Sequence, residues 1–219
     1  MTKNMTTNKH PDRERCLQYL EEYETPPHVV GHCKAVADVA CRIGAALNEA
    51  GGTKAPVIAE VTFEQFDKAN GFKGYRIDEA KTDMDTGVFR MFDLALTEAA
   101  GLLHDMARVE ENHWDVAADF CLTHGMEEEA KAIRVHMQYE FTVDAWHLTE
   151  ADLICLGDRL VLEDHYTGID ERMDYIIAKA ERRGQMHARE AILRKKEETK
   201  VLLRQIEERI GMSLDTLMQ

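Results

Sequence analysis

The sequence predicts an all-α fold built as one domain. Apolar residues recur every three or four positions over most of the chain, which is the period of an amphipathic helix. The strict alternation of apolar and polar residues that marks a half-buried strand is weak throughout. No Pro/Gly/Ser-rich linker or change in composition divides the chain into two parts. We therefore expect a single bundle of helices.

The chain opens with a polar segment and a short helix. We expect residues 1–10 to form a disordered tail and residues 11–219 to form the domain. A first helix is predicted from near Pro11 to Tyr23, because it places three apolar or aromatic residues on one face: Cys16, Tyr19 and Leu20.

The most regular helical pattern follows. Thr25 can cap the free backbone N–H groups of a helix whose first turn tolerates the prolines that come next. The helix is predicted to extend to Glu49 and to stop at the glycine pair 51–52. Its predicted buried face consists of Val29, Cys33, Val36, Ala40, Ile43 and Leu47.

Residues 51–92 have no sustained helical pattern and contain several glycines. A short helix is predicted only around Thr62–Asn70. Segments of this length inside a compact domain are usually functional or mobile. We interpret this one as an irregular insertion between the second and third helices, placed where it could cover a site.

Helical patterning resumes after the insertion. Asp93 is a predicted cap, and Thr149 with Asp152 forms an acidic variant of the capping box. The predicted helices are Leu94–Met106, Asn112 or His113 to Thr123, Glu127–Met137, Thr149–Leu162, Gly168–Arg183 and a long C-terminal helix over about 185–210. We expect this last helix to pack along its own domain, and the alternative is that it forms a homodimer contact.

The charge of the chain limits its partners. It has 27 basic and 41 acidic residues and a formal net charge of −14. Binding to a nucleic-acid polymer depends on Lys and Arg displacing counterions from phosphates, so we expect no such partner. A small anionic substrate that is held by a metal remains compatible with this charge.

The sequence shows no sign of a membrane or secreted protein. It lacks a run of about 18 apolar residues, and its polar start lacks the apolar core of a signal peptide. Its five cysteines are scattered, without a C-x-x-C pair. We therefore expect a cytoplasmic protein with reduced thiols and no membrane partner.

His104 and Asp105 stand side by side at the end of a small, apolar helical run. Imidazole and carboxylate are common ligands of first-row divalent metals. A dipeptide alone does not make a site, because successive helical residues point about 100° apart. Further ligands must come from other segments.

Four more residues of ligand type qualify. His32 lies beside an apolar stripe, His136 lies on a partly apolar helical face, and Asp158 interrupts an apolar run directly after a glycine that clears space. His113 follows the His-Asp pair closely enough to turn back toward it. A buried carboxylate is costly without a partner, and a cation beside Asp158 would remove that cost.

A purely structural alternative exists for each residue. A lone histidine on such a face can be a core hydrogen-bonder, and Asp158 can pair with Arg159 or another base. The occurrence of His, His-Asp and Asp on separate helices with inward faces favours a metal site. The ligand types suit Fe, Mn, Zn, Co or Ni.

These residues resemble the H…HD…D signature of the HD superfamily of metal-dependent phosphohydrolases. The segment 102–108 is similar to that family's LLHDIAK/R segment, and the segment 157–161 is similar to its ADKLV segment. The resemblance extends from about Pro27 to Ile177 without the insertion. Two subgroups look closest: HD domains that accompany molybdenum-cofactor-type nucleotidyltransferases, and HD hydrolases of diadenosine tetraphosphate.

The resemblance implies a helical HD domain with one or two metal ions, Fe or Mn being expected first. The residues that would hold the first ion are His32, His104, Asp105 and Asp158. His113 and His136 would add a second ion, with Asp105 as the bridge between the two.

The resemblance also implies a phosphohydrolase. Its substrate would be a phosphate ester or anhydride of a nucleotide-like small molecule, attacked by hydroxide formed from water at the metal. Asp105 and Arg108 are the predicted catalytic residues. Arg108 would contact a phosphoryl oxygen, or it would form an ordinary surface ion pair. The alternative function is a non-catalytic HD module that binds a metal or nucleotide and regulates a partner.

Overall fold

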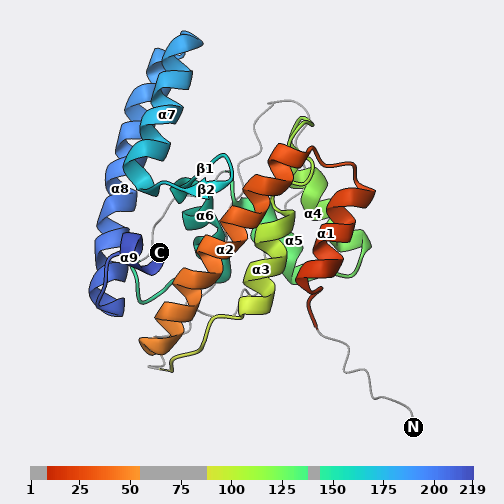
Figure 1. Cartoon of the computed structure of the whole chain (residues 1–219), viewed down its shortest axis with the longest axis horizontal. Coiled ribbons are helices and arrows are strands. Elements are labelled where there is room, and N and C mark those ends of the chain that lie inside the picture. The colour runs from red at the N-terminus through yellow and green to blue at the C-terminus, as the bar shows by residue number, and fades with distance from the viewer. Residues whose placement is uncertain (1–8, 55–87, 138–143) are drawn as a thin grey trace, which may run out of the picture.

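The computed structural model confirms the all-α class (Figure 1). It describes residues 9–54, 88–137 and 144–219. These residues form helices α1 (Arg13–Glu22), α2 (Pro27–Glu49), α3 (Leu94–Leu103), α4 (His113–Thr123), α5 (Glu127–Val135), α6 (Glu150–Leu160), α7 (Gly168–Arg182), α8 (Met186–Ile210) and α9 (Leu214–Leu217), with strands β1 (Val161–Leu162) and β2 (His165–Tyr166).

Helix α2 runs through the centre of the molecule (Figure 1). It packs against α3 and α6, while α1 and α5 pack on α3 and α4 packs on α5. On the other side, α7 and α8 pair and project beyond the body (Figure 1). The predicted apolar faces of the first two helices are buried, which confirms both patterns, and all of their residues except Val29 and Cys33 belong to one continuous core.

Two glycines let helices approach α2 closely. A Cβ added at Gly101 on α3 would lie 2.9 Å from Ala37 Cα, and one at Gly157 on α6 would lie 2.8 Å from the Val36 carbonyl oxygen. These separations are shorter than van der Waals contact, so a larger residue would push the helices apart. The close packing brings the ends of α3 and α6 to the same stretch of α2.

The His-Asp helix ends earlier than predicted, at Leu103 rather than Met106. Thr25, which was expected to cap α2, instead donates a hydrogen bond of 2.9 Å to the Met106 carbonyl oxygen. The N-cap of α2 is Pro26, without a side-chain cap. The prediction for Thr25 was therefore wrong, and its hydroxyl holds the turn after α3.

Two further predicted helices are also shorter. Helix α5 ends at Val135 instead of Met137, and α6 ends at Leu160 because the next two residues extend into β1 and pair with β2. The caps are better predicted: Asp93 caps α3, and the Thr149–Asp152 capping box is present.

The ends of the insertion lie side by side. Thr53 and Arg90 form an antiparallel bridge with two backbone hydrogen bonds of 2.8 Å. The predicted helix at Thr62–Asn70 lies outside the described residues, as does the tail up to residue 8. The expected tail was wrong at His10, whose buried ring lies 2.7 Å from Glu129 and is held by this contact.

Helix α8 packs along its own domain, as expected. Leu202, Leu203 and Ile206 are buried in the common core. The homodimer remains a prediction.

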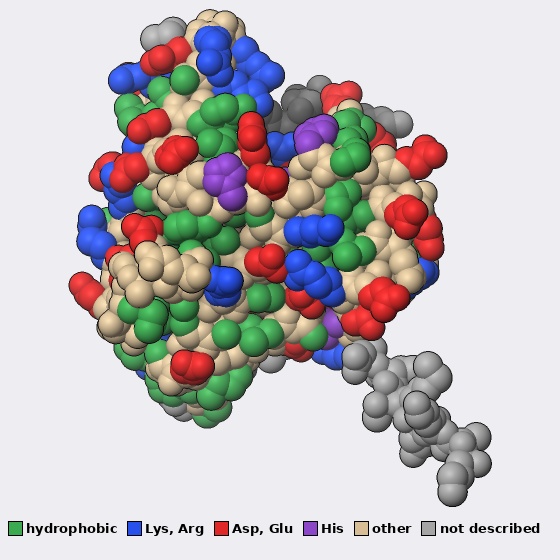
Figure 2. All heavy atoms as spheres, in the orientation of Figure 1, with side chains coloured by type: hydrophobic (Ala, Val, Ile, Leu, Met, Phe, Trp, Pro, Cys, Tyr) green, Lys and Arg blue, Asp and Glu red, His purple; other side chains and the backbone are tan. Residues whose placement is uncertain are grey.

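In the described part of the chain, no helix is both long and apolar enough to cross a membrane. Acidic side chains are scattered over the face in Figure 2, and basic ones gather at the free end of the α7–α8 pair.

Candidate metal centre

The predicted ligands converge from five helices. His32 lies on α2, His104 and Asp105 follow the last residue of α3, and His113 begins α4. His136 directly follows α5. The early ends of α3 and α5 matter here, because they place histidines at turns rather than on a continuing helical face. Asp158, in the last turn of α6, lies beside the group.

Asp105 lies at the centre and is almost completely buried. Its Oδ1 is 3.0 Å from His113 Nε2 and 3.5 Å from His136 Nε2. Its Oδ2 is 3.6 Å from His104 Nε2 and 3.8 Å from His32 Nε2. Each carboxylate oxygen therefore faces its own pair of imidazoles.

Two three-residue groups result, and they share Asp105. One consists of His32, His104 and Asp105, and the other of Asp105, His113 and His136. Within each group the ligand atoms all lie within 4.8 Å of one another, close enough to hold a metal ion. These buried groups are the strongest indication of a cation site in the described residues.

Backbone carbonyls hold three of the four rings. Nδ1 donates to the Glu163 carbonyl in His32 (2.9 Å), to Gly101 in His104 (2.8 Å) and to Ile133 in His136 (2.7 Å). A proton on Nδ1 leaves a lone pair on Nε2 of the neutral ring. Such outer hydrogen bonds usually fix the tautomer of a metal-binding histidine.

The inward-facing atoms lie close to one another but make no well-formed hydrogen bonds among the described residues. The buried Nε2 atoms of His104, His113 and His136 have no hydrogen bond there, and neither does Asp105 Oδ1. An unsatisfied buried polar atom is costly, and several acceptors that face one another repel. A cation at each group would satisfy these atoms, so the residues fit a metal.

The protonation states also suit metal binding. Burial lowers the pKa of His104 to about 4, so its imidazole is neutral at neutral pH. Burial alone would raise the pKa of Asp105, but the surrounding histidines and Arg108 hold it well below its usual range. The two residues therefore present a lone pair and a carboxylate, which are the ligating forms.

Asp158 lies at the edge of the centre. Its Oδ1 is 3.1 Å from His32 Nε2 and 3.4 Å from Arg172 Nη2, and Arg172 Nε also donates to the Asp158 carbonyl. Burial raises the pKa of Asp158, but His32 and Arg172 outweigh it and keep the carboxylate ionised. Asp158 pairs with Arg172 rather than Arg159, and its ligation of the first ion stays a prediction.

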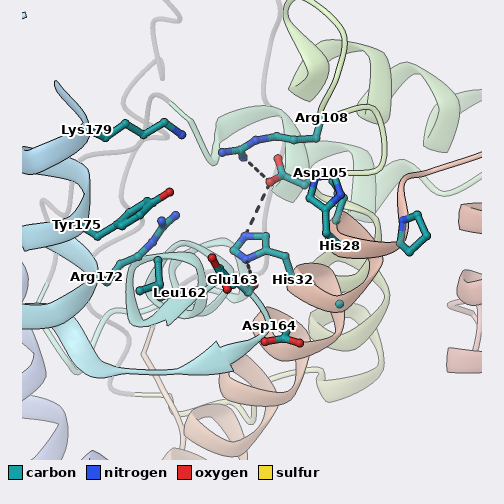
Figure 3. Close-up of a pocket in the computed structure, with 13 residues that line it drawn as sticks. His28, His32, Asp105, Arg108, Leu162, Glu163, Asp164, Arg172, Tyr175 and Lys179 are labelled. Carbon is teal, nitrogen blue, oxygen red and sulfur yellow. Dashed lines mark hydrogen bonds and ion pairs between the residues drawn. The ribbon is translucent and has the colours of Figure 1, made fainter. Parts of the chain in front are cut away.

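Arg108 forms an ion pair with Asp105 Oδ2. Its side chain is partly exposed and lines a cavity of about 490 Å³ that also reaches His32 and Asp105 (Figure 3). This is not the ordinary surface ion pair of the alternative, because the Asp105 carboxylate is buried, and the contact of Arg108 with phosphate stays a prediction.

Some residues at this site were not predicted from the sequence. The Glu163 carbonyl reaches His32 because Glu163 adopts a left-handed conformation (φ 56°) in the β1–β2 turn. No sequence pattern predicted this conformation. Tyr175 and Lys179 also line the cavity. Their spacing with Arg172, three and then four residues, was a readable signal of one helical face.

Comparison of the chain with protein-family models, with curated proteins and with solved structures found no match.

Proposed function

We propose that the protein is a metal-dependent phosphohydrolase of the HD type. Its substrate would be a phosphate ester or anhydride of a nucleotide-like small molecule. The observation that carries this proposal is Asp105, whose two oxygens face two pairs of imidazoles, three of them buried, while the same residue lines an open cavity. The resemblance of the H…HD…D residues to the HD superfamily supports it.

Each group around Asp105 would hold one divalent ion. His32, His104 and Asp105 would hold the first, with Asp158 beside them, and His113 and His136 would hold the second with Asp105 between the two. Fe or Mn suits these nitrogen and oxygen ligands, as do Zn, Co and Ni. When bound, such ions lower the pKa of water toward about 7 and neutralise phosphoryl oxygens.

The residues of the chain position the substrate. Arg108 reaches the cavity next to Asp105, where its planar guanidinium can donate two parallel hydrogen bonds to a phosphoryl group. Arg172 keeps Asp158 ionised and directed at His32. The carbonyl tethers fix the imidazoles before any substrate arrives, so the centre is preorganised.

A phosphate-release screen tests this function. Protein supplied with Mn²⁺ or Fe²⁺ should release phosphate from at least one nucleotide or dinucleoside polyphosphate. Asp105→Ala should lower the rate at least a hundredfold and lose most of its metal, because Asp105 contacts both groups. The control is Asp119→Ala, which removes an exposed carboxylate from α4 and should leave both properties unchanged.

Two results would contradict the hydrolase. One is metal-loaded protein that releases no phosphate from any compound, which would favour a module that binds metal or nucleotide to regulate a partner. The other is an Asp105→Ala variant that stays active and keeps its metal.

A further inference from the structure

The cavity beside the metal centre has walls of unequal charge. It lies between the start of α2, the β1–β2 turn and α7, and His32 and Asp105 form part of its lining. Three cationic side chains line it: Arg108, Arg172 and Lys179. Three acidic side chains line it as well, Asp105, Glu163 and Asp164, so the lining has no excess of cations, and an anion site here depends on where the cations lie.

The three cations differ in what they contact. Arg108 pairs with Asp105, and Arg172 pairs with Asp158, so both are tied to carboxylates of the metal centre. Lys179 has no carboxylate partner among the described residues, and its Nζ lies 6.0 Å from the centre of the Tyr175 ring. Its ammonium group therefore remains available to a ligand.

Lys179 points into the cavity. Arg172, Tyr175 and Lys179 are spaced by three and four residues and present one face of α7 to the cavity. Figure 3 shows the Lys179 ammonium and the Arg108 guanidinium extending toward each other from opposite walls. The acidic residues Glu163 and Asp164 lie toward the other end of the cavity (Figure 3). An anionic ligand would thus extend from Asp105 toward Lys179.

We propose that Lys179 binds a second phosphate of the substrate, next to the phosphate held at Arg108 and the metal centre. This inference rests on the proposed function and narrows it to phosphoanhydrides, such as a nucleoside diphosphate or triphosphate, over monoesters with a neutral leaving group. Hydrolysis would form one P–O bond from water and break the bridging P–O bond. The bridging oxygen leaves with the electron pair, and the protons of water pass to the product phosphates and solvent.

Binding of two non-hydrolysable probes tests the site. Methylenediphosphonate carries two phosphonate groups and methylphosphonate carries one. Calorimetric titration of the full chain supplied with Mn²⁺ should give tighter binding of the diphosphonate. Lys179→Met should raise its Kd about tenfold or more, as expected for the loss of one charged hydrogen bond. The Kd of methylphosphonate should change less than about twofold, since it lacks the second group.

The matched control is Arg182→Met, which removes one positive charge from the same helix at a position that does not line the cavity. It should leave both Kd values unchanged. Chelation of Mn²⁺ by the diphosphonate is the same for the wild type and each variant, so it cancels when their Kd values for this one probe are compared. Equal affinity of the wild type for both probes would overturn the proposal, as would equal effects of Lys179→Met on both.

The two proposals fail separately. A wild-type protein that releases no phosphate from any compound contradicts the hydrolase, while the two Kd values still decide whether Lys179 binds a second phosphate. If phosphate release occurs but Lys179→Met leaves diphosphonate binding unchanged, the hydrolase stands and the second site is wrong.

Discussion

Asp152 is a buried acid that lies outside the candidate metal centre. One carboxylate oxygen accepts a hydrogen bond of 2.6 Å from the Thr149 backbone N–H, which completes the capping box of α6. The other oxygen is buried and has no hydrogen-bond partner among the described residues. Burial raises the pKa of Asp152 to about 7. The capping hydrogen bonds favour the ionised carboxylate, but burial outweighs them and favours the protonated carboxyl.

Asp152 should make stability depend on pH. Between the unfolded pKa near 3.8 and the folded pKa of about 7, the folded state keeps a proton that the unfolded state releases. The stability contributed by this group is thus lost as the pH rises, at about 1.4 kcal/mol per pH unit at most.

Urea unfolding of the wild type and Asp152→Asn at pH 5 and pH 8 measures the effect. The asparagine does not ionise, so the variant should gain stability relative to the wild type by a few kcal/mol on going to pH 8. The same difference at both pH values would show that Asp152 ionises normally.

At the residue scale, the sequence predicted the types of ligand but not how they are held. His32, His104, Asp105, His113 and His136 could be chosen from helical faces and from the resemblance. Their tethers could not, because the acceptors are backbone carbonyls of Gly101, Ile133 and Glu163, and every residue carries a carbonyl. Only the folded turn decides which carbonyl meets a ring.

At the element scale, the position of α6 against α2 sets the separation between Asp158 and His32. Gly157 is the residue before Asp158, and the Val36 carbonyl oxygen lies only 2.8 Å from where a Cβ of residue 157 would be. Backbone cannot rotate away as a side chain can, so the contact leaves no room for a methyl group.

Gly157→Ala should lower the free energy of unfolding by about 1–3 kcal/mol, the usual cost of overpacking. Gly44→Ala on α2 is the matched control, since its Cβ would meet the ends of two leucine side chains, which can move. In the control, the helix propensity gained over glycine offsets part of the cost. Denaturant unfolding measures the free energy of unfolding of both variants. A Gly157→Ala protein as stable as the wild type would show that α6 does not depend on this close contact with α2.

Helix interiors were predicted better than helix ends. The apolar stripe of α2 depends on local period alone, and its six predicted residues are buried. The ends of α3 and α6 depend on residues distant in sequence. The Thr25 hydroxyl donates a hydrogen bond to the Met106 carbonyl oxygen after α3, and β2 pairs with the two residues after α6. A local sequence pattern does not contain these long-range contacts, so it cannot predict the residue at which a helix ends.

For the whole molecule, the net charge does not describe the cavity. The chain carries −14 overall, whereas three cationic and three acidic side chains line the cavity at the candidate metal centre. Composition alone predicted that nucleic-acid polymers are not partners, but it could not locate an anion site. The fold places these cations at one cavity by bringing α7 to face the turn after α3.

The central claim is that Asp105 joins two metal-binding groups, and the metal content per chain tests it most directly. Elemental analysis of protein prepared with Mn²⁺ or Fe²⁺ should find two ions per chain in the wild type. His136→Ala should retain one, because it removes a ligand from only one group. A wild-type protein that holds no metal with either ion would contradict the account.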